Sequence, residues 1–157
     1  MKRFLVLVPL VLLLAGAVAD KPVAYWTFKT TPSTLATVEL EPGDEIDLIF
    51  TATLDPEWCV YSTDFSADAG SQTTTFEIIP DDSFEGVGGI RSVEPRRKKD
   101  KAGNMEVSYF ASKAEFRQRI RVLSPDYIVK GVIRGQYCNE KKRLCLPFEQ
   151  LFVFSIQ

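Results

Sequence analysis

Hydrophobic and polar residues alternate along several stretches of this chain. In "EIDLIFTATL", for example, the apolar residues Ile46, Leu48 and Phe50 recur at every second position, with polar neighbours such as Asp47 between them. A period of two is typical of strands that bury one face. The same alternation occurs in three further stretches, so four strands are predicted at 45–54, 114–123, 127–137 and 151–156. No stretch after residue 20 carries a sustained helical period.

Polar turn sequences separate these predicted strands. "EPGDE", "SADAGSQ" and "SPDY" combine Pro, Gly, Asp and Ser, which favour turns. Short strands at regular spacing with polar turns between them predict an all-β fold, an immunoglobulin-like antiparallel β-sandwich. The stretch 83–103 is rich in glycine and charged residues, and we expect it to form a long mobile loop.

The N-terminus has the pattern of a secretory signal peptide. Lys2 and Arg3 precede an apolar run over 4–14, and small residues end at Ala19. This order predicts a signal peptide over 1–19, cleaved between Ala19 and Asp20, and a single mature domain over 20–157. An uncleaved membrane anchor is the alternative, but the apolar run is short for a membrane span. We therefore expect a periplasmic or secreted protein.

The composition excludes several kinds of chemistry. The chain has no histidine, which rules out a Ser-His-Asp triad, a Cys-His nucleophile pair and any His-ligated metal site. It has neither glycine-rich phosphate-binding motif. The formal net charge of −2 does not suggest a nucleic-acid partner. The basic run 96–101 is interpreted as a solvated loop, or alternatively as a weak docking patch. We expect no small-molecule cofactor.

The cysteines carry the candidate chemistry. Cys138 ends one strand pattern and Cys145 lies just before another, in "CNEKKRLC". If the flanking strands form a hairpin, the two residues face each other with their Cα atoms about 4.5 Å apart. A disulfide tolerates Cα separations of about 4.4–6.8 Å. A disulfide between them is therefore geometrically easy.

Two interpretations of this pair stay open from the residues alone. Closing so short a loop stabilises the fold by roughly 2.5 kcal/mol, and a domain of this size hardly depends on that. Lys141, Lys142 and Arg143 place positive charge beside the sulfurs, which favours thiolate and faster exchange. Against this redox interpretation, hairpin disulfides also occur as inert staples.

The third cysteine, Cys59, is left as an odd thiol in an oxidising compartment. It is interpreted as a buried, inert side chain. The alternatives are an intermolecular disulfide or a third redox thiol. Its neighbours Trp58 and Tyr61 could flank the sulfur pair, although aromatic residues at alternating strand positions usually pack in the core.

Three segments of the chain, taken in order, resemble one family. They are "LDPEWCVYSTDF" (54–65), "MEVSYFASKAEFRQRI" (105–120) and "VIRGQYCNEKKRLCLPFEQLFVFSI" (132–156). Together they resemble the N-terminal periplasmic domain of the bacterial thiol:disulfide interchange protein DsbD, especially its Bacteroidetes-type versions. The third segment is the most specific, because it has a strand end, Cys, a short loop and then Cys followed by Leu and Pro.

The resemblance implies an immunoglobulin-like sandwich in which Cys138 and Cys145 carry electrons, with no cofactor beyond these cysteines. It implies that Cys138 forms the mixed disulfide with partners and that Cys145 resolves it. The electron donor would be a membrane thiol reductase or a thioredoxin-like protein, and the acceptors would be periplasmic thioredoxin-fold proteins. If the pair is redox active, the protein is a component of a protein-disulfide reductase-type relay.

The resemblance also implies a cap that shields the disulfide, in the region "KKDKAGNMEVSY". The residues expected to shield or flank the pair are Tyr61, Met105, Tyr109 and Tyr137. Two other hypotheses remain beside the carrier. One is a non-catalytic secreted β-sandwich binding module whose disulfide is structural. The other is metal or copper handling by the three thiols.

Overall fold

The computed structural model describes residues 21–31, 39–65, 72–99 and 105–155, and within these ranges the chain forms ten strands and no helix. No helix long and apolar enough to cross a membrane is therefore found in this part of the chain. The predicted signal peptide and its cleavage site between Ala19 and Asp20 lie outside the described residues. The strands are β1 (Ala24–Thr31), β2 (Glu45–Leu54), β3 (Cys59–Tyr61), β4 (Thr75–Ile78), β5 (Phe84–Ser92), β6 (Arg96–Lys99), β7 (Glu106–Ala111), β8 (Lys113–Val122), β9 (Ile128–Asn139) and β10 (Leu144–Ser155).

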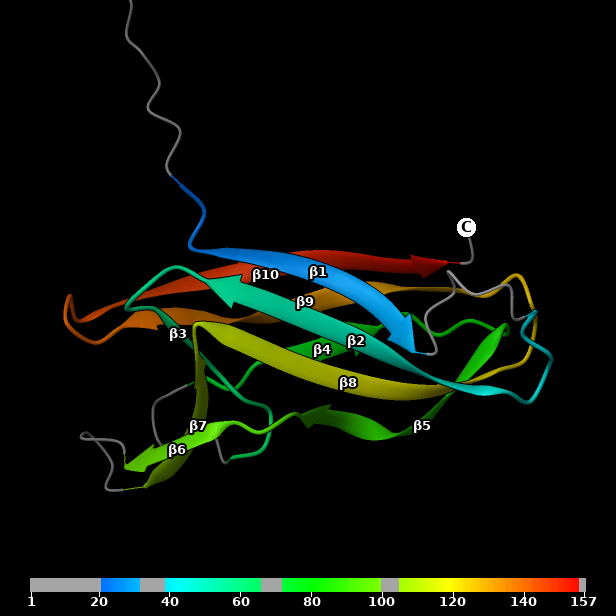
Figure 1. Cartoon of the computed structure of the whole chain (residues 1–157), viewed down its shortest axis with the longest axis horizontal. Helices are drawn as coiled ribbons and strands as arrows, with labels where there is room; N and C mark the ends of the chain where they lie inside the picture. Colours follow the sequence, from blue (N-terminus) through cyan, green and yellow to red (C-terminus); the bar gives the residue numbers. More distant parts are fainter. Residues whose placement is uncertain (1–20, 32–38, 66–71, 100–104, 156–157) are drawn as a thin grey trace, which may run out of the picture.

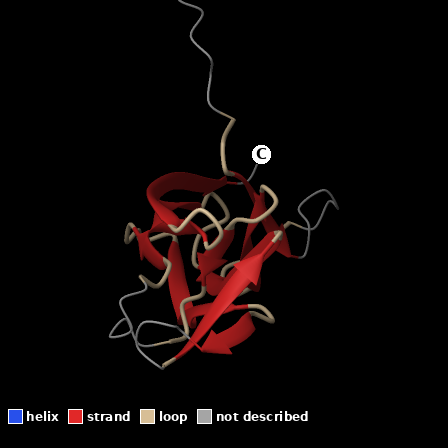
Figure 2. Ribbon diagram, turned by 90° about the vertical axis from the view of Figure 1, so that its left-hand side faces the viewer, coloured by secondary structure: helices blue, strands red, loops and turns tan. Residues whose placement is uncertain are grey.

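These strands form two antiparallel sheets packed face to face (Figures 1 and 2). One sheet has the order β1-β2-β8-β5. The other is six-stranded, with the order β10-β9-β3-β7-β6, and β4 also pairs with β9. The predicted immunoglobulin-like antiparallel β-sandwich is confirmed. The turn between β9 and β10 lies at one end of the molecule, at the left of Figure 1.

The core lies between the two sheets and follows the alternation in the sequence. Leu48, Phe50, Phe116 and Ile133 are fully buried there. The ring of Phe50 on β2 lies 4.9 Å from that of Phe152 on β10, so the two sheets contact through aromatic side chains. The four predicted strands are confirmed as β2, β8, β9 and the second half of β10.

The prediction of a long loop over 83–103 is wrong for most of that stretch. Residues 84–92 form β5, which pairs with β8, and residues 96–99 of the basic run form β6, which pairs with β7. The pairing of β5 shifts register between Val87 and Arg91, and Gly88 has a φ of 70° there. This irregularity breaks the period-two pattern, which is why the strand was not visible in the sequence. Residues 100–103 lie outside the described ranges.

Candidate thiol–disulfide site

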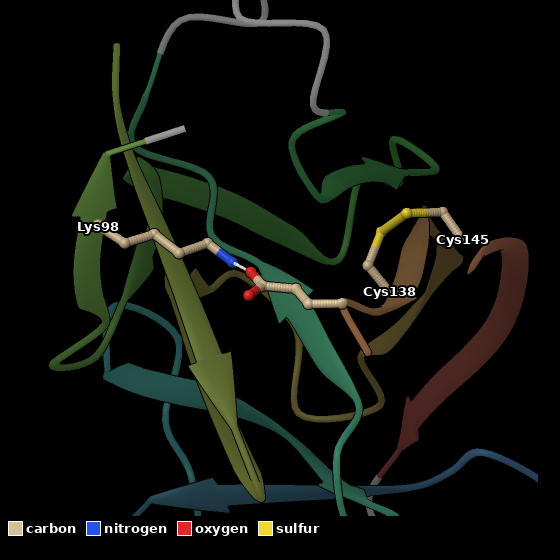
Figure 3. The surroundings of a disulfide bond; sticks show 4 residues. Lys98, Cys138 and Cys145 are labelled. Carbon is tan, nitrogen blue, oxygen red and sulfur yellow. Dashed lines mark hydrogen bonds and ion pairs between the residues drawn. A yellow bond between two sulfur atoms is a disulfide. The ribbon is translucent and has the colours of Figure 1, made fainter. Parts of the chain in front are cut away.

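Cys138 and Cys145 lie at the turn end of the β9–β10 hairpin, where they are direct cross-strand partners. Their Cα atoms are 4.1 Å apart, and their sulfurs are joined in a disulfide (Figure 3). The prediction that a hairpin sets these two cysteines opposite each other is confirmed. Strand β9, which contains Cys138, and strand β10, which contains Cys145, thus position the two cysteines.

Aromatic rings over glycines fix the register of this hairpin. Phe152 lies opposite Gly131, and Phe148 lies opposite Gly135. A Cβ atom at Gly131 would lie 2.6 Å from the ring of Phe152, and one at Gly135 would lie 2.9 Å from the ring of Phe148. A shift of one residue in the pairing would turn every side chain of the shifted strand to the other face of the sheet. These glycine–aromatic pairs therefore also keep Cys138 directly opposite Cys145.

The turn itself is tied to the rest of the sheet. The side-chain oxygen of buried Asn139 accepts a hydrogen bond of 3.0 Å from the backbone N–H of Lys142. Glu140 pairs with Lys98 of β6, the residue labelled in Figure 3, and Lys141 pairs with Glu57 at 2.6 Å. These contacts hold the turn in place, so the disulfide does not lie on a free loop.

The two cysteines differ sharply in exposure. Cys138 is only 3% exposed, whereas Cys145 is exposed. The cause is the topology, because β9 has neighbours on both sides while β10 is the edge of its sheet. Leu144 and Leu146, which flank Cys145, are also exposed, at 42% and 37%. A reagent or a partner arriving from solvent therefore reaches Cys145 before Cys138.

Some of the residues expected to flank the pair gather on the outer face of the six-stranded sheet. Tyr61 and Tyr109 pack in one cluster with Cys59 and Cys138. The ammonium of Lys98 lies 4.3 Å from the ring centroid of Tyr109 and 5.5 Å from that of Tyr61, within the range of cation–π attraction. This cluster covers the buried side of the disulfide.

The other two expected residues lie elsewhere. Tyr137 belongs to the core between the sheets, where its ring stacks on Phe148 at 4.2 Å. Its hydroxyl accepts a hydrogen bond of 2.7 Å from Nε1 of Trp26. Met105 is 37% exposed just before β7. Gly103 and Asn104 of the expected cap lie outside the described residues.

Cys59 is brought next to the disulfide by β3, which pairs with β9. It is the direct cross-strand partner of Cys138. Its side chain is 6% exposed, and burial raises the pKa of its thiol, against the opposite effect of Lys98. Sequence reasoning did not place Cys59 beside Cys138, because the pairing of two distant strands has no local signal.

A pocket of about 240 Å³ opens beside Cys59. Cys59, Trp58 and Tyr109 form part of its apolar lining, and Lys98 and Glu140 lie among its charged residues. The residues that the structure describes contain no cluster of three or more Cys, Asp or Glu arranged to hold a metal ion. The chemistry that this arrangement offers is exchange between thiols and disulfides.

Comparisons of this chain with known proteins give matches at the level of structure. No protein-family model matches the chain, and no curated protein matches its sequence. The N-terminal periplasmic domain of ScsB from Proteus mirabilis has a TM-score of 0.54 and 10% identity, over 85% of this chain and 45% of that one. At this identity, the likeness shows a shared fold.

Two other solved structures come from Neisseria meningitidis. The reduced N-terminal domain of DsbD has a TM-score of 0.48 and 15% identity, over 74% of this chain and 79% of that one. The complex between the DsbD and PilB N-terminal domains has a TM-score of 0.48 and 12% identity, over 82% and 80%. Both contain the DsbD domain that the sequence resembles.

Proposed function

We propose that this protein is a periplasmic thiol–disulfide exchange carrier that passes electrons through Cys138 and Cys145 to thioredoxin-fold partners. One observation carries the proposal: the disulfide joins a buried cysteine to an exposed one at the end of the molecule. The resemblance of three sequence segments to the DsbD domain supports the same role. The shared fold with the ScsB domain is compatible with it.

The difference in exposure between the two cysteines supports a particular division of roles. In the reduced protein, the Cys145 thiolate attacks a sulfur of the partner's disulfide, which forms a mixed disulfide and releases one partner thiolate. Cys138, after losing its proton, then attacks Cys145 and releases the second partner thiolate. Two electrons and two protons leave the carrier. This assignment is the reverse of the one that the resemblance implies, because Cys138 is buried by β3 and β10.

The surroundings of Cys145 suit a protein partner. Exposed Leu144 and Leu146 offer apolar contact beside the sulfur, and Lys142 and Arg143 supply positive charge in the adjacent turn. Positive charge stabilises thiolate and so favours attack on a disulfide. Reduction of the carrier by a membrane thiol reductase or a thioredoxin-like donor follows the same steps in reverse, with the donor thiolate attacking Cys145.

The reduction potential tests whether the pair is an exchange centre. We would measure it by thiol labelling across a dithiothreitol series, on a Cys59→Ser variant that contains only the pair. A value of about −180 to −270 mV is that of exchange proteins and is the result expected. A value below about −300 mV marks a structural disulfide and would favour the binding-module hypothesis.

Trapping tests the roles of the sulfurs. In the Cys59→Ser background, Cys138→Ser leaves the exposed Cys145 and is expected to accumulate a mixed disulfide with an oxidised thioredoxin-fold protein. The matched variant Cys145→Ser leaves only the buried Cys138 and should accumulate much less. More adduct on Cys138 than on Cys145 would restore the assignment that the resemblance implies.

A further inference from the structure

The three cysteines of the chain form one row across three neighbouring strands. Cys145 on β10 pairs with Cys138 on β9, and Cys138 pairs with Cys59 on β3. Residues that are direct cross-strand partners place their side chains on the same face of a sheet. All three sulfurs therefore lie on the outer face of the six-stranded sheet, with Cys138 in the middle.

The backbone geometry places Cys59 within disulfide reach of Cys138. The Cα separation of 4.1 Å between Cys138 and Cys145 is the short spacing of a pair without mutual backbone hydrogen bonds. The backbone groups of Cys138 thus face β3, and Cys59 and Cys138 form the wider, hydrogen-bonded kind of pair, about 5.5 Å apart at Cα. That spacing lies inside the range of about 4.4–6.8 Å that disulfides adopt.

Cys59 and Cys145 are too far apart to be joined. They lie two strands apart in the sheet. At about 4.8 Å for each strand spacing, their Cα atoms are nearly 10 Å apart. A disulfide does not bridge Cα atoms more than about 7 Å apart without movement of the backbone. Cys138 is therefore the one sulfur that can bond to either of the other two.

We propose that Cys59 is a third exchange thiol, which attacks the sulfur of Cys138 and moves the disulfide from Cys138–Cys145 to Cys59–Cys138. One S–S bond forms and one breaks. Cys59 gives up its proton, and Cys145 leaves as a thiolate that can take a proton from solvent. No electrons are gained or lost, so the step needs no oxidant or reductant.

The contacts around Cys59 are those of such a thiol. It packs in one cluster with Cys138, and the pocket of about 240 Å³ opens beside it. Lys98 favours its thiolate, while burial and Glu140 oppose it. Its cross-strand partner is one half of the disulfide, and the cationic Lys98 lines the same pocket.

The result of the exchange is a second oxidised form of the protein with different reactivity. In that form the disulfide lies on the two buried cysteines, and the exposed Cys145 is a free thiol. This free thiol can attack a partner's disulfide before any donor has reduced the carrier. The inference deepens the proposed function because it uses the same disulfide, but the exchange step itself needs no partner.

Variants in which one of the three cysteines is replaced test the proposal directly. A Cys145→Ser variant, oxidised with glutathione disulfide, is expected to lose both free thiols and to yield a Cys59–Cys138 cross-linked peptide by mass spectrometry. The matched variant Cys138→Ser keeps Cys59 and Cys145 and is expected to form no intramolecular disulfide. If Cys145→Ser keeps its thiols unlinked, or if Cys138→Ser cross-links equally well, the proposal is overturned.

The unaltered protein provides a second measurement that does not depend on how a variant folds. The oxidised protein would be labelled with N-ethylmaleimide under native conditions and then digested. Label on Cys145 together with a Cys59–Cys138 cross-link is the result expected from the second oxidised form. The complete absence of both would count against the proposal. The reduction potential of the Cys59→Ser variant tests the relay separately, so either idea can fail without the other.

Discussion

Trp26 on β1 donates a hydrogen bond from its indole Nε1 to the hydroxyl of Tyr137 on β9, with 2.7 Å between the two atoms. This bond joins the two sheets at the residue directly before Cys138. The ring of Trp26 also lies 5.9 Å from that of Phe148, which stacks on Tyr137. The turn end of the β9–β10 hairpin is thereby fixed to the opposite sheet.

Replacing Tyr137 by Phe is expected to lower the free energy of unfolding by about 1–3 kcal/mol. The substitution keeps the stacked ring but leaves the partly buried Trp26 N–H without its acceptor. Urea denaturation measures the change. Tyr25→Phe is the matched control, because Tyr25 is 54% exposed on the same strand as Trp26 and should change the stability little. Equal effects of the two substitutions would contradict the role given to the bond.

Replacing Gly131 by Ala is expected to destabilise the protein by at least about 1–3 kcal/mol. A Cβ atom there would lie 2.1 Å from the backbone oxygen of Glu77 on β4, which cannot move without breaking its strand pairing. Gly89→Ala is the control, since its Cβ would meet nothing within 4 Å and its φ is not positive. Thermal unfolding of both variants gives the comparison, and an unchanged midpoint for Gly131→Ala would refute the packing argument.

Asp47 is expected to stabilise the fold in a pH-dependent way. The hydrogen bond from Arg119 holds the pKa of Asp47 below its ordinary value, against the opposing effect of burial. A carboxylate whose pKa is lowered on folding stabilises the native state above its unfolded pKa, near pH 4, and this contribution is lost as the pH falls through the folded pKa. Asp47→Asn should therefore cost about 1.5–3 kcal/mol at neutral pH.

The difference in stability between the natural protein and Asp47→Asn should shrink below about pH 4. Urea denaturation at a series of pH values measures it. Glu149→Gln is the control, because its pair with Arg134 is exposed on both sides and such pairs contribute at most about 1 kcal/mol. A difference for Asp47→Asn that stays constant into the acid range would show that its charge is not the cause.

Replacing Lys98 by Met is expected to slow alkylation of Cys59 in the reduced protein. Burial raises the pKa of the Cys59 thiol, and the Lys98 charge partly offsets this increase, so removing the charge lowers the fraction of thiolate. Iodoacetamide labelling followed by peptide mass spectrometry measures the rate as a function of pH. Lys99→Met is the control, since Lys99 is the exposed next residue on β6. Faster alkylation of Cys59 in Lys98→Met would contradict this electrostatic role.

Much of the framework of this protein is local and so could be predicted from the sequence. Alternation in 45–54 predicted β2 and its buried face, because a strand turns successive side chains to opposite sides. The closeness of Cys138 and Cys145 could also be predicted, because only a short turn separates their strands. The irregular β5 could not, since its register shift between Val87 and Arg91 interrupts the pattern.

What the tertiary structure alone decided is which strands are neighbours and which lie at an edge. Cys145 is exposed because β10 is an edge strand, and Cys138 is buried because β3 and β10 cover β9 on both sides. Cys59 lies beside Cys138 because β3 and β9 pair, although a long stretch of chain separates them. Hydrophobic alternation specifies the face of a strand but not its partners. Those partners follow from packing the whole core, so the row of three sulfurs exists only in the folded protein.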